Sequence, residues 1–347
     1  MPAPLQTQEY VKNELPYEIL MSLYKNSRAS LRELGRDLGI SYHTINTTLK
    51  ELEKKYKIEY TLEIDASRLG FTESRIITIK FGNMPDINFL KTRITKDMFI
   101  QNAYLADGEF DLLLHIVGIG EKDFQNWQWN FRMDLSNYKP IFKFCTVSGG
   151  MVGFLPLREE LIRQTSVLSK TEINLLVILN SNSRIRIKEI SKKLRLPPSR
   201  IVYIMKKLRN LGIIKKFTAL TQNPDKRIIC AYGASIIAAK EHFDLAYEFA
   251  QIVLQENFHA IVNDYSLVLS TNGSFDHLCL CVFEDGETLI KRGPELLKLV
   301  WGKEEPEIEK ALLTGVILGS WPFHLEKYEQ YSNFVASYRS PGKSSNQ

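Results

Sequence analysis

The residues with the clearest chemical potential are basic, and they gather in one part of the chain. Between Ser183 and Lys216 stand twelve lysines and arginines against a single acid, Glu189, which gives this stretch of 34 residues a net charge of +11. The whole chain of 347 residues carries only +5, so the remainder is acidic on balance. Positive charge confined to one module is typical of a protein that binds a polyanion.

A second block with the same pattern lies earlier in the chain. Asn26-Ser27-Arg28 recurs as Asn182-Ser183-Arg184, and seven apolar positions around each motif recur at the same offset of 156 residues. Further along, Gly108-x-Phe110-Asp111 recurs as Gly273-x-Phe275-Asp276 at an offset of 165. Periods this long exceed those of solenoid repeats and indicate two tandem copies of a domain pair. The first block, Lys25 to Lys57, holds eight bases and four acids and is less basic.

Each block predicts three short helices followed by a strand. In the first copy Ser30 and Glu33 have the spacing of a capping box, Gly39 breaks the helix and Ser41 can cap the next one. The second copy has the same box at Ser169-x-x-Glu172, then Pro197-Pro198 in the turn, a third helix over 199–210 and Gly212 after it. This order is the helix-turn-helix pattern. We expect the strands over 58–64 and 213–220 to be wings.

After each block the apolar period changes to that of strands. Residues 75–81, 99–106, 110–117 and 141–147 are expected strands, with helices over 87–94 and 122–135. That order is βαββαβ, the ferredoxin-like arrangement, and the second copy repeats it between residues 227 and 319. Asp107-Gly108 and Asn272-Gly273 are predicted to be two-residue type I′ hairpin turns.

The predicted fold class is α+β, with two winged helix-turn-helix domains and two ferredoxin-like βαββαβ domains in tandem. The expected divisions are a disordered N-terminus (1–14), winged helix-turn-helix 1 (15–66), ferredoxin-like domain 1 (67–157), a linker (158–168), winged helix-turn-helix 2 (169–222), ferredoxin-like domain 2 (223–323), and a C-terminal helix and tail (324–347).

This combination of a short winged helix-turn-helix and a βαββαβ domain with a Gly-x-Phe-Asp hairpin resembles the Lrp/AsnC (feast/famine) family of prokaryotic transcription regulators. The resemblance covers residues 15–157 and again 169–323, and is most specific over 28–58, 184–214 and the two hairpins. Family members usually carry one copy per chain and dimerise through their βαββαβ (RAM, or Lrp-type) domains. The resemblance therefore implies an intramolecular pseudo-dimer, with further homo-oligomers left open. The Lys- and Ile-rich composition suits an archaeal origin.

In a helix-turn-helix the third helix enters the major groove of double-stranded DNA with its N-terminal residues near base edges. Asn46 can read adenine, and Arg200 is the best candidate for guanine. Because the outward positions differ between the copies, we expect an asymmetric target or one dominant half-site, with most of the salt dependence from the second copy. The alternative interpretation is that these are solvated helix faces. The candidate DNA-binding residues are Tyr42, His43, Asn46, Thr47, Lys50, Ser199, Arg200, Tyr203, Lys206 and Lys207.

The family resemblance also implies a small-molecule effector, often an amino acid, bound near the Gly-x-Phe-Asp hairpin. The alternative is structural, since glycine supplies a positive φ in a tight turn and the aspartate can brace it. We favour this alternative. The positions that the resemblance suggests for the effector are Asp107, Gly108, Asp111, Asn272, Gly273 and Asp276.

Other reactive residues favour packing over chemistry. His277, Cys279 and Cys281 alternate along one predicted strand, a spacing that a metal could use, but the first copy has apolar residues there, so we predict packing and no metal. Trp127-x-Trp129 on a predicted helix is also assigned to packing. Gly118-x-Gly120 lacks the third glycine of a nucleotide fingerprint. With no Ser/His/Asp or Cys/His arrangement evident, we expect neither a cofactor nor an enzyme.

The bulk composition indicates the kind of protein and the cellular compartment. An apolar fraction of 44% and a charged fraction of 24% are ordinary for a globular protein, and no leader or membrane span is indicated. The four cysteines show no framework of even spacing and fit a reducing compartment. We therefore expect a cytoplasmic protein associated with the nucleoid and with no membrane partner.

Two other functions remain open from the sequence. Sirohaem decarboxylases resemble the same family in two-half form, with His and Arg clusters after the wing. Here Arg75-Ile76-Ile77 and Arg227-Ile228-Ile229 bring arginine without histidine, and such an enzyme has no use for a strongly basic recognition module. The third interpretation is a chromatin-like DNA binder without sequence preference.

Overall fold

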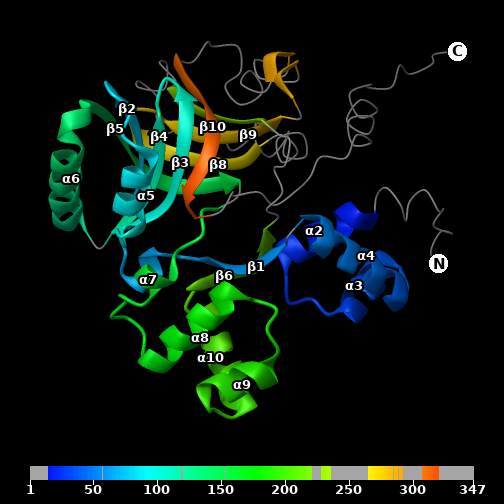
Figure 1. Ribbon diagram of the computed structural model, residues 1–347. Coiled ribbons are helices and arrows are strands. Elements are labelled where there is room, and N and C mark those ends of the chain that lie inside the picture. Colours follow the sequence, from blue (N-terminus) through cyan, green and yellow to red (C-terminus); the bar gives the residue numbers. More distant parts are fainter. Residues whose placement is uncertain are drawn as a thin grey trace, which may run out of the picture.

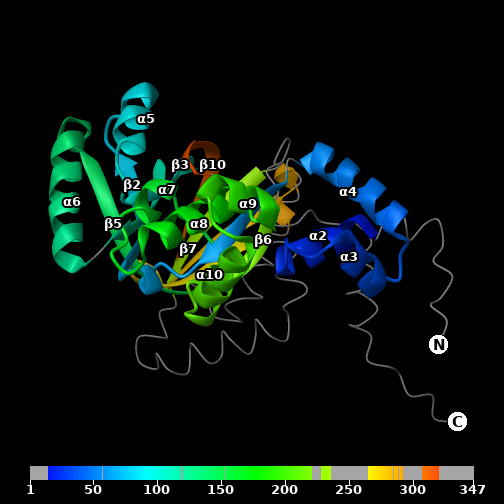
Figure 2. The same cartoon turned by 90° about the horizontal axis from the view of Figure 1, so that it is seen from below.

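The chain folds into two helical heads, a two-stranded ribbon between them and one large closed sheet (Figure 1). This computed structural model describes residues 15–56, 58–118, 120–152, 154–220, 228–235, 265–283, 285–287, 289–291 and 307–319. Both heads lie on the same side of the closed sheet, and Figure 2 views the molecule from that side.

Head 1 consists of α2 (Leu15–Lys25), α3 (Leu31–Leu38) and α4 (Tyr42–Tyr56). The capping box is confirmed, because Ser30 Oγ accepts the Glu33 amide at 3.2 Å and the Glu33 carboxylate accepts the Ser30 amide at 2.7 Å. Gly39 ends α3 in the left-handed conformation, with φ 69°. A residue with a Cβ would be disfavoured there, so the turn between α3 and α4 is encoded locally.

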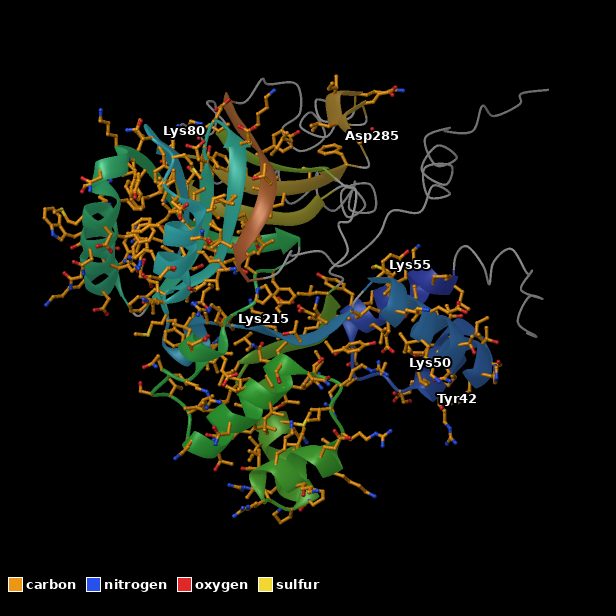
Figure 3. The ribbon with its side chains drawn as sticks, in the orientation of Figure 1. Tyr42, Lys50, Lys55, Lys80, Lys215 and Asp285 are labelled. Atoms are coloured by element: carbon orange, nitrogen blue, oxygen red, sulfur yellow. The ribbon has the colours of Figure 1, made fainter. Side chains whose placement is uncertain are left out.

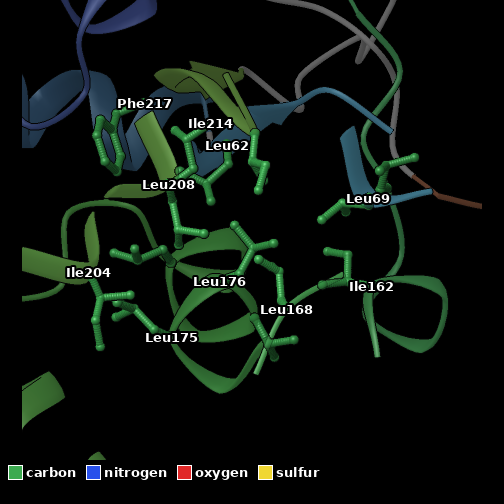
Figure 4. Close-up of a cluster of buried hydrophobic side chains, with 14 of the residues drawn as sticks. Leu62, Leu69, Ile162, Leu168, Leu175, Leu176, Ile204, Leu208, Ile214 and Phe217 are labelled. Atoms are coloured by element: carbon green, nitrogen blue, oxygen red, sulfur yellow. The ribbon is translucent and has the colours of Figure 1, made fainter. Parts of the chain in front are cut away.

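Head 2 repeats this arrangement with α8 (Lys170–Ser181), α9 (Ile187–Leu194) and α10 (Pro198–Asn210). Its capping box at Ser169 and Glu172 is also present. Pro198 stands in the first turn of α10, where its missing N–H costs no helical hydrogen bond. The core of head 2 is drawn in Figure 4, where Leu175, Leu176, Ile204 and Leu208 converge from α8 and α10.

The first ferredoxin-like unit has the predicted element order. It runs β2 (Glu73–Phe81), α5 (Ile87–Thr95), β3 (Ile100–Gly108), β4 (Leu112–Gly118), α6 (Glu121–Leu135) and β5 (Pro140–Val152), with 3-10 turns at Ser67–Leu69 and Ser136–Tyr138. The second copy contributes β7 (Ile228–Ser235), β8 (Tyr265–Gly273), β9 (His277–Phe283) and β10 (Glu307–Leu318). The βαββαβ order expected for the second copy includes a helix over 243–256, which lies outside the described residues, and one over 287–300, most of which does. The C-terminal helix expected within 324–347 also lies outside them.

The eight strands of the two copies form one closed barrel in the order β10-β3-β4-β2-β5-β8-β9-β7. The first copy supplies β3-β4-β2-β5, the strand order of a ferredoxin-like sheet. The copies join through two antiparallel seams, β5 with β8 and β10 with β3. Strand β5 extends to Val152, beyond the predicted end at residue 147, because its last residues pair with the other copy. Closure of this kind leaves no exposed sheet edge.

Apolar side chains fill both faces of the barrel wall. The inner cluster joins the copies, with Tyr104 and Leu113 from the first copy against Phe275 and Leu280 from the second. On the outer face of the first copy, α5 and α6 cover the sheet. Trp127 is buried there as predicted, whereas the packing predicted for Trp129 is wrong, since that side chain is 68% exposed.

The two hairpin turns differ from the type I′ prediction. Gly108 and Gly273 have φ of 146° and 147°, outside the region that a type I′ turn requires, and each is the last residue of its strand. A Cβ on Gly108 would lie 2.6 Å from Lys310 O, and one on Gly273 would lie 3.0 Å from Cys145 Cα. Glycine is needed because each hairpin approaches the backbone of the other copy, a contact that local sequence does not reveal.

The strands expected to be wings pair with each other. Strand β1 (Glu59–Ile64) of the first copy and β6 (Ile214–Leu220) of the second form an antiparallel ribbon in which Thr61 faces Thr218. The packing is crossed, because Leu62 of β1 lies in the core of head 2 and Ala219 of β6 lies in the core of head 1. Neither head therefore has a core made only from its own copy.

The predicted linker over 158–168 contains a short helix, α7 (Glu159–Ile162). Leu161 and Ile162 are fully buried, and Figure 4 shows Ile162 beside Leu69 at the edge of the head 2 cluster. The segment therefore attaches head 2 to the barrel by packing. Within the described ranges, no helix has the length and apolar character needed to cross a membrane.

Candidate nucleic-acid interface

The third helix of head 1 turns its candidate residues to the surface. Ile45, Leu49 and Leu52 are buried in the head, so the opposite side of α4 faces away from the core. Tyr42 is 55% exposed, His43, Thr47 and Lys50 are exposed and Asn46 is half-buried. Tyr42 and Lys50 lie at the outer side of the head in Figure 3. The geometry leaves these side chains accessible, as a recognition helix requires.

The third helix of head 2 has the same construction with different residues. Ile201, Ile204 and Leu208 are buried, and Ser199, Arg200, Lys206 and Tyr203 (57% exposed) face outward. The Arg200 guanidinium lies 5.1 Å from the centre of the Tyr203 ring, an arrangement that orients its donors. Val202, not predicted as a site residue, is 53% exposed on this helix. Apolar side chains at such positions can contact thymine methyl groups.

Lys207 differs from the other candidates because its charge is already paired. Its Nζ donates a hydrogen bond of 2.7 Å to Glu172 Oε1, and Glu172 is also the acidic member of the α8 capping box. Burial alone would raise the pKa of Glu172, but the hydrogen bonds from Lys207 and Ser169 and the Lys207 charge lower it to about 2. Lys207 therefore tethers α10 to α8, a partner that helical periodicity does not reveal.

The other basic residues of the second block divide into paired and unpaired sets. Lys215 and Lys216 face Asp65 and Glu63 across the ribbon at 4.0 and 3.4 Å, and Arg186 lies 4.0 Å from Glu189. Within the described part of the chain, a second set on or beside α9 and α10 has no acidic partner within ion-pair distance. We call this set the basic surface of head 2; its members are Lys188, Lys192, Lys193, Arg195, Arg200 and Lys206.

Head 1 has no comparable concentration of charge. Glu51 and Glu53 lie on α4 itself, and Glu53 Oε1 accepts the Tyr60 hydroxyl at 2.5 Å. Arg36 is paired with the adjacent Asp37 at 3.1 Å. The two heads thus share one fold but differ in the positive charge on their surfaces, as the net charges of the two sequence blocks predicted.

The hairpin positions suggested for an effector differ in their surroundings. Gly108 and Gly273 touch the backbone of the other copy, and Asp111 accepts hydrogen bonds from Lys80 Nζ at 2.6 Å and the Phe81 amide at 2.7 Å. Asp107 and Asn272 are exposed, and Asp276 is half-buried. The contacts of Asp111 and both glycines match the structural alternative stated above.

The strand with the cysteines lies in the barrel wall. Cys279 and Cys281 are fully buried and His277 is nearly so. No group of three or more potential metal ligands occurs among the described residues. A buried histidine of the first copy, His115, was not singled out by the sequence; Ser74 Oγ and Asn102 Nδ2 lie 3.1 and 3.2 Å from its ring nitrogens. Burial lowers the pKa of His115 to about 4.

Comparison with known proteins places these heads in a family. A family described as winged helix-turn-helix DNA-binding matches twice, over residues 12–55 and 168–215. An uncharacterised HTH-type transcriptional regulator of Pyrococcus abyssi is 30% identical over 103 residues, which are 29% of this chain and 69% of the relative. The HTH-type transcriptional regulator LrpC of Bacillus subtilis is 36% identical over 105 residues, 30% of this chain and 72% of LrpC. The chain belongs to the Lrp/AsnC family.

This Lrp/AsnC protein is unusual in length relative to those relatives, since each matches under a third of it while most of the relative is covered. A solved structure similar over almost the whole chain is the sirohaem decarboxylase NirDL. It aligns with 93% of this chain and 99% of its own at a TM-score of 0.55 and 12% identity. At that identity the likeness concerns the fold, and it supports the duplicated arrangement of heads and sheets described above.

Proposed function

We propose that this Lrp/AsnC protein regulates transcription by binding double-stranded DNA with both heads of a single chain. The observation that carries the proposal is the exposure of the outward sides of α4 and α10 together with the basic surface of head 2. Its relatives are named transcriptional regulators. Unpaired lysines and arginines beside a recognition helix neutralise phosphates, and polar residues at the N-terminal end of that helix reach base edges.

The two heads have unequal roles in this proposal. Head 2 supplies most of the affinity through its basic surface, while head 1, whose α4 offers Tyr42, His43, Asn46 and Thr47, contributes mainly base contacts. Arg200 is placed to contact guanine, and Asn46 to contact adenine. Because α4 and α10 present different side chains, the preferred site is not a palindrome.

The two copies act as an intramolecular pseudo-dimer in this proposal. The seams β5 with β8 and β10 with β3 join the sheets, and the ribbon joins the heads. The functional units follow the proposed domain boundaries, with residues 15–66 and 169–222 reading DNA and residues 67–157 and 223–323 forming the shared body. Such a role places the protein with the chromosome in the cytoplasm.

We also propose an amino-acid effector, which rests on the family resemblance, since Gly108 and Gly273 contact the other copy and Asp111 is bonded to Lys80 and Phe81. A thermal shift assay with each of the twenty amino acids tests it. An effector that binds the folded chain raises its melting temperature, and the rise continues roughly with the logarithm of concentration above the Kd.

Selection of bound fragments from random DNA tests the main proposal. We expect one enriched, asymmetric sequence with two unlike half-sites. Enrichment of no sequence, with equal binding to all duplexes, would instead indicate a chromatin-like role. Failure to bind any duplex at low ionic strength would contradict both.

The fold likeness to NirDL makes tetrapyrrole binding the second candidate to test. Arg75, the described arginine of the strand after the ribbon, pairs with Glu73 at 3.0 Å and with Glu121, and lies 4.0 Å from the centre of the Phe124 ring. It is therefore committed to carboxylates of this chain. Arg227 lies outside the described residues. We expect sirohaem to show no shifted absorption band when it is mixed with the protein.

A further inference from the structure

The repeated Asn-Ser-Arg motif meets itself between the two heads. Ser27 Oγ and Ser183 Oγ lie 2.5 Å apart and share a hydrogen bond, and both residues are 0% exposed. These serines are separated by 156 residues in the sequence. The motif that first marked the duplication therefore lies at the contact between the copies.

The backbone around each serine is bonded to the opposite strand of the ribbon. The Ser27 amide donates to Phe217 O, and the Ser183 amide donates to Tyr60 O, both at 2.9 Å. These two bonds are equivalent, because Tyr60 and Phe217 occupy corresponding positions next to the central threonine pair. Each head is thus bonded to the strand that belongs to the other copy.

The central threonines repeat this reciprocity. Thr61 Oγ1 donates to Asn180 O at 2.8 Å, and Thr218 Oγ1 donates to Tyr24 O at 2.7 Å. Both acceptors lie near the C-terminal ends of the first helices, α8 and α2, where helical carbonyls lack intrahelical partners. The ribbon therefore caps one helix of each head.

The two arginines of the motif cross from one head to the other. Arg28 Nη1 donates to Ser183 O at 2.5 Å and to Ile185 O at 3.2 Å, and Arg184 Nη1 donates to Ser27 O at 2.7 Å. Their guanidinium groups also lie over ribbon aromatics, Arg28 at 5.6 Å from the centre of Phe217 and Arg184 at 5.1 Å from that of Tyr60. Planar donors that bridge carbonyls and stack on rings are not replaceable by lysine.

The arginines lie close to each other without a carboxylate partner in ion-pair contact within the described part of the chain. Burial, and then the charge of Arg184, lower the pKa of Arg28. Two like charges would push the heads apart, so the carbonyl bonds and the ring contacts must hold them together. Placing two partly buried positive charges near each other costs electrostatic energy, and the contacts described above must offset that cost.

Head 1 depends on this contact for its placement. Its core cluster contains residues of α2, α3 and α4, with Ala219 and Tyr60 from the ribbon and Ile58 just before it, and no described residue of the barrel. Head 2, in contrast, packs on Val117 of barrel strand β4 and on Leu69 and Phe71 beside the barrel. The ribbon and the motif contact are therefore what orient α4 relative to α10.

We propose that Ser27, Arg28, Ser183 and Arg184 form a clasp that fixes the separation and rotation of the two recognition helices and so sets the spacing between DNA half-sites. These are positioning residues, and their role rests on the proposed function of the heads. The clasp fixes the distance between the two heads. Half-sites at the wrong spacing therefore engage only one head at a time.

The geometry of the clasp is tested without DNA by the double variant Ser27→Cys/Ser183→Cys. Side chains this close allow a disulfide within normal geometry. We expect near-complete intramolecular cross-linking under mild oxidation, seen as a faster band on a non-reducing gel and as a monomer whose mass is lower by the two hydrogens lost to the oxidant. A pair that stays reduced, or that links only between chains, would overturn the clasp whether or not the chain binds DNA.

The role of the clasp is tested with duplexes whose two half-sites, taken from the selected sequence, are separated by the native spacer or by about five extra base pairs, half a turn of DNA. The unaltered chain should lose at least about tenfold in affinity at the wrong spacing, the loss expected when one head is disengaged. The variant Arg28→Lys/Arg184→Lys should lose less than about threefold, with unchanged affinity for a single half-site. Arg32→Lys and Arg186→Lys, the same change at exposed arginines, should behave as the unaltered chain.

A quadruple variant that combines the two cysteines with Arg28→Lys/Arg184→Lys tests whether a covalent link restores the spacing preference. Once oxidised, this quadruple variant should regain the spacing preference, and reduction should remove it again. Unchanged spacing preference in the arginine variant, or no recovery on cross-linking a folded chain, would refute the clasp while leaving DNA binding itself intact.

Discussion

At the scale of single residues, two neighbouring lysines on α10 carry the same formal charge but differ in whether that charge is available to a ligand. Lys206 is exposed without an acidic partner among the described residues, whereas Lys207 is held by Glu172 at 2.7 Å. Residue type and helical position predict the same role for both. The difference depends on α8, which packs beside α10 only in the folded head.

Substitution of the two lysines should therefore have different effects. Lys206→Ala should reduce the slope of log affinity against log salt by about 1, because one phosphate contact is lost. Lys207→Ala should leave that slope nearly unchanged and lower the free energy of unfolding, since the buried carboxylate of Glu172 loses its ion-pair partner. Salt titrations of DNA binding and urea unfolding measure the two effects. Equal slopes for both variants would contradict the assignment.

His115 gives the barrel a pH dependence of its own. Burial lowers its pKa to about 4, while in the unfolded chain the group titrates near 6.5. The unfolded state therefore binds more protons between these values, and stability should fall as pH drops from 6.5 toward 4, by at most about 3 kcal/mol. His115→Leu, which installs the apolar type found at the matching Leu280, should flatten this region of a urea-unfolding series against pH. An unchanged profile in that variant would assign the effect to other groups.

At the scale of elements, the sequence predicted what local chemistry determines. Capping boxes, the left-handed Gly39 and the proline turn specify where helices begin and end, and these signals lie within a few residues of each other. Helix α7 was missed because burial of Leu161 and Ile162 comes from partners far along the chain. The ribbon pairing was missed for the same reason, since alternation identifies a strand but not its neighbour.

The two capping boxes should differ in strength. Ser169→Ala removes the cap of α8 and a hydrogen bond to Glu172, which is buried and bonded to Lys207, so we expect a loss of about 1 to 2 kcal/mol. Ser30→Ala removes an equivalent cap whose Glu33 is exposed, and about 0.5 kcal/mol should be lost. Urea unfolding of each variant measures the difference. A larger loss for Ser30→Ala would show that burial of the acid does not matter.

At the scale of the whole molecule, the barrel and the ribbon make the two copies one cooperative body. Strand pairing across both seams and the crossed cores were beyond sequence reasoning, because they join residues more than a hundred positions apart. The duplication itself was readable from sequence, and with it the number and kinds of elements. Which surfaces of the copies meet is a property of the folded pair.

A seam glycine tests this cooperativity. Gly108→Ala places a Cβ 2.6 Å from Lys310 O at φ 146°, so we expect a loss of about 3 kcal/mol or more from overpacking and backbone strain. Gly118→Ala is the matched control in barrel strand β4: its Cβ would lie no nearer than 3.9 Å to another residue, so stability should change little. Thermal unfolding should stay a single transition in both variants. A separate early transition in Gly108→Ala would mean that the halves unfold independently.

The unlike outward faces of α4 and α10 affect the orientation in which the chain can bind along a chromosome. A reader built from two identical chains binds a palindrome equally well in either sense, so it cannot tell upstream from downstream. With two different reading helices in one chain, only one polarity along the duplex satisfies both. Under the function proposed above, the protein would therefore act as an oriented marker on a promoter, presenting the same flank to the transcription machinery each time it binds.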